Sequence, residues 1–145
     1  MKRCGVLLVL AFTLVTASFA GELPHVCVIS HAEGTVGERL VYNIKEFIRN
    51  SHAMKFMASE KETNCLRLII NTIPLEERPA SNMSTVFSVT WVVALGSHEE
   101  GYIDSTLGYC GTKRVTETAE SIVARTERLV GAMTLPSNES QPTPR

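Results

Sequence analysis

The sequence predicts an α+β fold, a two-layer sandwich in which two amphipathic helices cover a mostly antiparallel sheet of about four or five strands. Two stretches, 35–49 and 115–130, carry apolar residues at helical spacing. Several runs with the twofold alternation of strands lie before and between them. A helix with one apolar face needs a cover, and a sheet with one apolar face supplies it.

The first strand and the first helix are predicted within the first 50 residues. Val26–Ser30 is rich in β-branched residues and predicts a short strand. Thr35 and Glu38 have the spacing of a capping box, which predicts the start of a helix. One apolar stripe then follows the helical period: Leu40, Val41, Ile44, Phe47 and Ile48.

The middle of the chain predicts two further strands and two connections. Met54–Met57 is expected to be a short strand, and 59–62 is expected to be a polar turn or one helical turn. From 65 to 70 the residues alternate, which predicts a strand with Cys65, Arg67 and Ile69 on its more polar face. Pro74–Asn82 contains two prolines and several charges and is expected to be a loop.

A long hairpin follows. From 85 to 95 one predicted face carries Phe87, Val89 and Trp91, and the other is more polar. Tyr102–Cys110 predicts the partner strand, antiparallel to the first. If this strand buries Ile103, Leu107 and Tyr109, then Cys110 points away from the helices. We expect a core that contains Phe47, Ile44, Leu68, Val89, Trp91, Ile122 and Leu129.

The last predicted element is a second amphipathic helix. Its apolar stripe includes Ile122 and Leu129, with acidic residues near the start and arginines near the end, as the helix dipole favours. Gly131 is a plausible stop just beyond the helix. The final stretch, rich in Pro, Ser, Asn and Gln, is expected to be a disordered tail.

The N-terminus has the layout of a secretory signal peptide. Lys2 and Arg3 precede an apolar run, and Ser18 and Ala20 occupy the small-residue positions of a cleavage site. The run is too short for a spanning helix, which needs roughly 20 apolar residues. We therefore expect a signal peptide at 1–20, a single domain at 21–132 and a tail at 133–145, in a secreted or periplasmic protein.

Composition narrows the range of partners. The formal net charge of −1 becomes −3 when Lys2 and Arg3 leave with the signal peptide. Such a chain has no electrostatic reason to bind nucleic acid or an anionic membrane surface. No second apolar stretch approaches membrane length. A protein partner is the expectation, and the oligomeric state stays open.

Three cysteines remain after the signal peptide: Cys27, Cys65 and Cys110. Exported proteins meet an oxidising compartment, so at most one disulfide is expected, with one thiol left over. Sequence alone leaves all three pairings open, and Cys65–Cys110 requires a sheet order that brings their ends together.

No residue pattern selects a catalytic, cofactor or metal site. His25, Cys27 and His31 are close in sequence, but metal motifs have tighter spacings, so an edge His, a disulfide Cys and a loop His are favoured. Asp104 is expected to be structural or solvated. Asn82 and Asn138 begin glycosylation sequons that matter only in a eukaryotic source.

The order of the patterned segments resembles that of small bacterial envelope proteins. The segments are the stripe of 40–48, Leu66/Leu68/Ile70, Phe87/Val89/Trp91 and Ile122/Thr126/Leu129. Together they resemble the plan of the N-terminal domain of TolB and of the lipoprotein LptE. The resemblance implies a non-enzymatic binding or assembly role in the cell envelope.

Two alternatives to that role follow from the same residues. One is an enzyme that uses Cys110, which precedes a helix and two basic residues, or a His/Glu pair. The stretch His98-Glu99-Glu100 lacks the second His of a zincin and is expected to be solvated. The other is a secreted inhibitor of cystatin type, which also packs a helix across an antiparallel sheet. The Gln-x-Val-x-Gly hairpin of that family is absent from the sequence.

Overall fold

The computed structural model describes residues 23–58, 64–75, 83–95 and 99–133. The predicted signal peptide, nearly all of the predicted tail, the turn at 59–62 and both sequon asparagines lie outside these ranges. The elements, in chain order, are β1 (His25–His31), α1 (Gly34–Asn50), β2 (Lys55–Met57), β3 (Cys65–Pro74), β4 (Ser84–Leu95), β5 (Glu99–Gly111), the 3-10 turn η2 (Thr112–Arg114) and α2 (Val115–Ala132).

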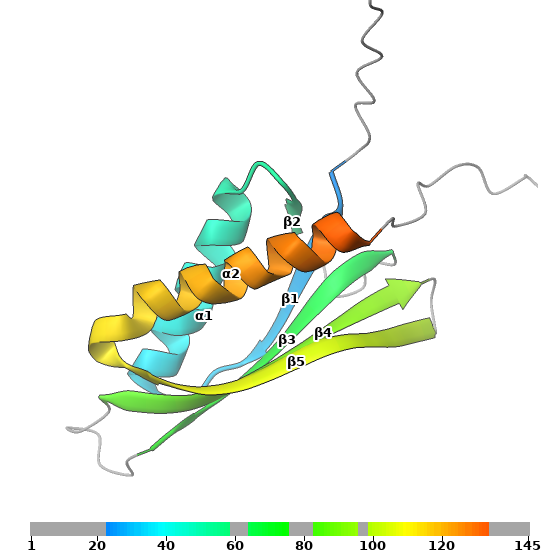
Figure 1. Cartoon of the computed structure of the whole chain (residues 1–145). Coiled ribbons are helices and arrows are strands. Elements are labelled where there is room, and N and C mark those ends of the chain that lie inside the picture. The colour runs from blue at the N-terminus through cyan, green and yellow to red at the C-terminus, as the bar shows by residue number, and fades with distance from the viewer. Residues whose placement is uncertain (1–22, 59–63, 76–82, 96–98, 134–145) are drawn as a thin grey trace, which may run out of the picture.

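The five strands form one mixed sheet in the order β2-β1-β3-β4-β5 (Figure 1). β1 is parallel to both of its neighbours, β2 and β3, whereas β3, β4 and β5 are antiparallel to one another. Parallel neighbours need a long crossover connection, and α1 supplies it between β1 and β2. The long strands β4 and β5 form the predicted hairpin, and β5 lies at the edge of the sheet.

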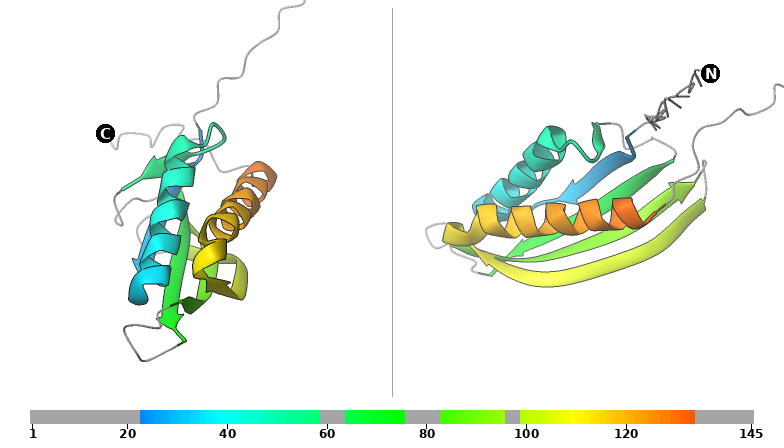
Figure 2. Two further views of the ribbon diagram at one scale, coloured as in Figure 1. Left: turned by 90° about the vertical axis from the view of Figure 1, so that its left-hand side faces the viewer. Right: turned by 45° about the horizontal axis from the view of Figure 1, so that its top comes forward.

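Both helices pack on the same face of the sheet, as Figures 1 and 2 both show. We call this the helix face and the opposite side the outer face. The predicted two-layer α+β sandwich is therefore confirmed. The helix stripes and the inward residues of the strands form the main core, which includes Leu40, Ile44, Leu68, Val89, Trp91 and Ile122. Phe47 and Leu129, both predicted in the core, are partly buried at its margin.

The entry into α1 differs from the prediction. The helix begins at Gly34 after Glu33, and no side chain caps it, so the predicted capping box of Thr35 and Glu38 is wrong. A hydroxyl from the sheet contributes instead: the Glu33 amide donates to Thr72 Oγ1 at 2.9 Å, and that hydroxyl donates back to the Glu33 carbonyl at 3.3 Å. Gly34 has a φ of 75°, in the left-handed region that favours glycine.

The predicted end of α2 is also wrong. Gly131 lies inside the helix, which continues to Ala132 and ends at Met133 in extended conformation. The Met133 amide donates to the carbonyls of Leu129 and Val130 and so closes the last turn. Of the helices that the structure describes, none is long and apolar enough to span a membrane.

Candidate functional site

Three of the large apolar side chains that the described residues expose lie on β5; others lie elsewhere, such as Tyr42 on α1 and Ile73 on β3. Its register with β4 places Asp104, Thr106 and Gly108 opposite Trp91, Val89 and Phe87, so these three β5 residues lie on the helix face. The alternate residues, among them Leu107 and Tyr109, therefore lie on the outer face. Leu107 is 75% exposed, and Tyr102 and Tyr109 are each 67% exposed.

A bulge explains why the sequence pattern misplaced these residues. Trp91 pairs with Asp104 and Val92 pairs with Tyr102, so Ile103 is an extra residue in β5. Ile103 packs against the main core, while Leu107 and Tyr109 are exposed. The condition considered from the sequence, that all three share a buried face, is therefore not met. It assumed one unbroken alternation along the strand.

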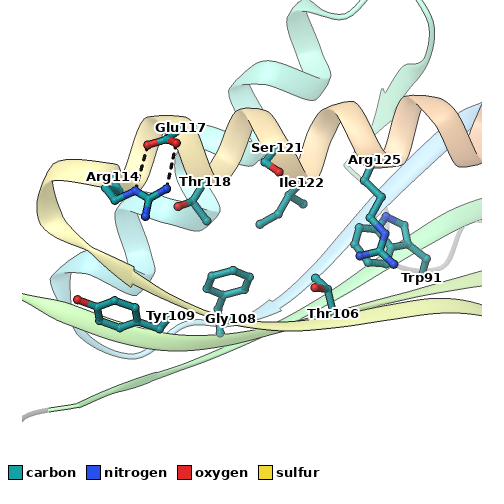
Figure 3. Close-up of a pocket in the computed structure, with 11 residues that line it drawn as sticks. Trp91, Thr106, Gly108, Tyr109, Arg114, Glu117, Thr118, Ser121, Ile122 and Arg125 are labelled. Carbon is teal, nitrogen blue, oxygen red and sulfur yellow. Dashed lines mark hydrogen bonds and ion pairs between the residues drawn. The ribbon is translucent and has the colours of Figure 1, made fainter.

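A cavity of about 250 Å³ lies between α2 and the β4–β5 hairpin (Figure 3). Phe87, Trp91 and Ile122 provide its apolar part, and hydroxyl groups come from both strand and helix, including Thr106 and Ser121. Gly108 makes room for this arrangement, since a Cβ there would lie 2.5 Å from Phe87 Cζ. The result is a groove with an apolar interior and polar margins, beside an edge strand.

Two ion pairs flank the groove. At its end near β5, Arg114 donates to both carboxylate oxygens of Glu117, each at 3.0 Å. The hydrogen bond and the charge of Arg114 lower the pKa of the Glu117 carboxyl, and Glu117 in turn raises the pKa of Arg114. Both side chains are exposed, so this pair contributes little to stability.

The second ion pair joins α2 to β5. Arg125 contacts the carboxylate of Asp104 at 2.6 Å through Nη2, and its guanidinium lies 5.1 Å from the centroid of the Trp91 ring. Asp104 also accepts a hydrogen bond from the Ser105 amide at 2.8 Å. Asp104 thus has a structural role, which agrees with the expectation from the sequence. Because each arginine at the groove already has a carboxylate partner, the groove offers no uncompensated cation.

The structure separates the three predicted disulfide candidates. Cys27 and Cys65 belong to one small buried cluster with Ala94. Cys110 lies in the main core on the helix side and is 1% exposed, so the orientation away from the helices that would have followed from a buried Leu107 and Tyr109 does not occur. It pairs in register with Thr85, and Thr85 with Pro74, which is nine residues along β3 from Cys65. Nine residues of strand span roughly 30 Å, so Cys65 and Cys110 lie far apart.

The other residues considered for chemistry are dispersed. His25 and His31 lie at opposite ends of β1. His98 lies outside the described residues, and the neighbouring Glu100 forms an ion pair with Arg67. Within the described ranges, no three His, Cys, Asp or Glu side chains are close enough to hold a metal ion. The residues that sequence reasoning missed are Leu107 and Tyr109, and the glycine between them is the one local signal that this strand packs unusually.

Comparison with known proteins shows a shared fold. No protein-family model matches the chain. No curated protein sequence matches it either. Among solved structures, it is similar to the hypothetical protein CT253 from Chlamydia trachomatis, with a TM-score of 0.53 at 10% sequence identity. The match covers 76% of this chain and 99% of the chlamydial chain. At this identity the likeness concerns the fold.

Proposed function

We propose that this chain is an exported, non-enzymatic binding protein that engages a protein partner through the outer face of β5. The observation that carries the proposal is the exposure of Tyr102, Leu107 and Tyr109 on one side of one strand. Large apolar and aromatic side chains that cluster on a surface typically mark contact sites, and tyrosine is enriched in protein interfaces. Export rests on the signal-like residues at 1–20.

The neighbouring residues of β4 extend this surface. Val86, half-buried, lies opposite Tyr109 and continues the apolar surface from the edge strand into the sheet, whereas Val92, opposite Tyr102, is buried. Between them, Ser88 and Thr90 lie opposite Leu107 and Ser105 and add hydroxyl groups without charge. An apolar patch with small polar groups suits a protein surface better than an ionic ligand.

The enzymatic alternative receives less support. The Cys110 thiol is buried and donates a weak hydrogen bond to the Gly111 carbonyl at 3.5 Å. A nucleophilic cysteine must present a thiolate to its substrate, typically beside a base. A reaction at Cys110 would therefore require the β5–α2 junction to open.

Site-specific photo-crosslinking in the source cells tests the proposal. A photoreactive phenylalanine derivative at position 107 should cross-link one protein species, and the same derivative at Arg128, exposed on α2, should not. With that species purified, Leu107→Lys should weaken binding at least tenfold and leave the melting temperature unchanged, because the side chain is exposed. Equal cross-linking at 107 and 128, or unchanged affinity of Leu107→Lys, would contradict the proposal.

A further inference from the structure

The edge of β5 can accept another strand. β5 spans 13 residues and, within the described part of the chain, pairs only with β4. Alternate backbone amides and carbonyls of an edge strand point outward and can pair with an added chain. From Ser105 to Gly111 the edge contains no charged residue, the feature with which proteins commonly block such pairing.

The groove under α2 lies directly beside this edge. In Figure 3, Thr106 and Gly108 of β5 face Ser121 and Ile122 of α2 across the hollow. A strand added to β5 would direct every second side chain to the helix face and thus toward this groove. The remaining side chains would lie on the outer face, next to Leu107 and Tyr109.

The size of the groove favours a side chain over a free small molecule. Its volume of about 250 Å³ is below the range of roughly 300–1,000 Å³ that small-molecule pockets typically have. It is suited to one large apolar side chain, which would lie against the parts of Phe87 and Ile122 that face the groove. The ion pairs of Arg114 and Arg125 leave no unpaired charge to attract an ionic group.

We infer that β5 and α2 together form a site for an extended, uncharged peptide segment that adds as a sixth strand and inserts one apolar side chain into the groove. This inference rests on the proposed function and specifies the class of partner: a protein with an exposed segment whose apolar residues alternate. Main-chain hydrogen bonds to β5 supply affinity, and the groove supplies specificity.

Selection from a phage library of random twelve-residue peptides tests this inference. The selected peptides should share apolar residues at alternate positions and lack charge at those positions. When one synthetic peptide from the selection is added to ¹⁵N-labelled protein, the largest amide shifts should occur in Ser105–Gly111 and along the groove side of α2. Shifts confined to another surface, or selected peptides without alternation, would overturn the inference.

Filling the groove separates this inference from the proposed function. Ser121 is exposed on the rim, so Ser121→Trp should preserve the fold and weaken binding of the selected peptide at least tenfold. Thr118→Phe provides a second filling variant, and Arg128→Trp, outside the groove, is the matched control with unchanged affinity. If Leu107→Lys abolishes binding and both filling variants do not, the outer-face surface stands and the groove site is overturned.

The competing occupant is a second copy of the chain. Sedimentation equilibrium should show a monomer, because β5 is expected to pair with a segment of a different protein. A dimer that Leu107→Lys dissociates would show that β5 pairs with itself, and it would overturn the inference.

Discussion

The absence of a side chain at Gly37 allows α1 to lie close to the sheet. A Cβ at Gly37 would lie 2.1 Å from Thr72 Oγ1 and 2.9 Å from its Cβ. The same hydroxyl holds the chain just before the helix, through its hydrogen bonds with Glu33. Gly37 therefore allows a sheet residue to fix the entry into α1, a task that the sequence pattern had assigned to a local capping box.

Two helical glycines offer a matched pair of substitutions. Gly37→Ala should lower the free energy of unfolding by about 1–3 kcal/mol, because the added methyl group collides with Thr72. Gly131→Ala, where a Cβ would meet nothing within 4 Å, should leave it unchanged or raise it by up to about 1 kcal/mol. Urea unfolding measures both. A stabilising Gly37→Ala would show that α1 does not pack this closely on β3.

Contacts between elements join α2 to the β4–β5 hairpin. The Trp91 indole Nε1 donates to Thr126 Oγ1 at 3.0 Å in the buried core. Thr126 in turn donates to the Ile122 carbonyl at 2.9 Å, one turn earlier in the helix. Together with the Arg125–Asp104 ion pair, the Trp91–Thr126 hydrogen bond holds α2 above the hairpin and thereby shapes the groove.

Removing the Thr126 hydroxyl should therefore be costly. Thr126→Val leaves the buried indole N–H without an acceptor, and it should lower the free energy of unfolding by about 1–3 kcal/mol. Thr116→Val, exposed on the same helix, is the control and should change it by less than about 0.5 kcal/mol. Trp91 is the only tryptophan, and its fluorescence would be affected by changes at Thr126, so unfolding is best followed by circular dichroism.

A double-mutant cycle with Trp91→Phe tests the pairing itself. The double variant should lose less stability than the two single variants combined, since neither partner is then left unsatisfied. Additive losses would show that the two side chains do not interact.

Periodicity predicted most elements because it records which side of each element is buried. The apolar stripe from Leu40 to Ile48 and the alternation from Phe87 to Trp91 both match the observed core. The exposed surface of β5, in contrast, depends on a bulge, which leaves no periodic pattern in the sequence. The single extra residue Ile103 shifts the alternation of β5, and only the pairing with β4 reveals it. The hydrogen bonds between Thr72 and Glu33 at the entry to α1 likewise join residues 39 positions apart.

At the scale of the whole molecule, the sheet divides the described cysteines into two sets. Cys27 lies opposite Arg67 in the β1–β3 register, so Cys65, two residues earlier on β3, is its diagonal neighbour. Cys110 lies in the core beneath the helices, at the far end of β5. A disulfide requires Cα atoms within roughly 7 Å, which excludes Cys110 as a partner of Cys65. Of the three pairings, Cys27–Cys65 is the one between neighbouring strands.

We accordingly expect any disulfide in this protein to join Cys27 to Cys65, with Cys110 remaining a thiol protected by burial. Mass spectrometry of protein recovered outside the cytoplasm should give an N-terminus at or near Gly21. Peptide mapping without reduction, after alkylation of the unfolded protein, should find the label on Cys110 in every molecule. A cross-linked peptide that contains Cys110 would contradict the register described above. Protein found only in the cytosol with Met1 intact would contradict export.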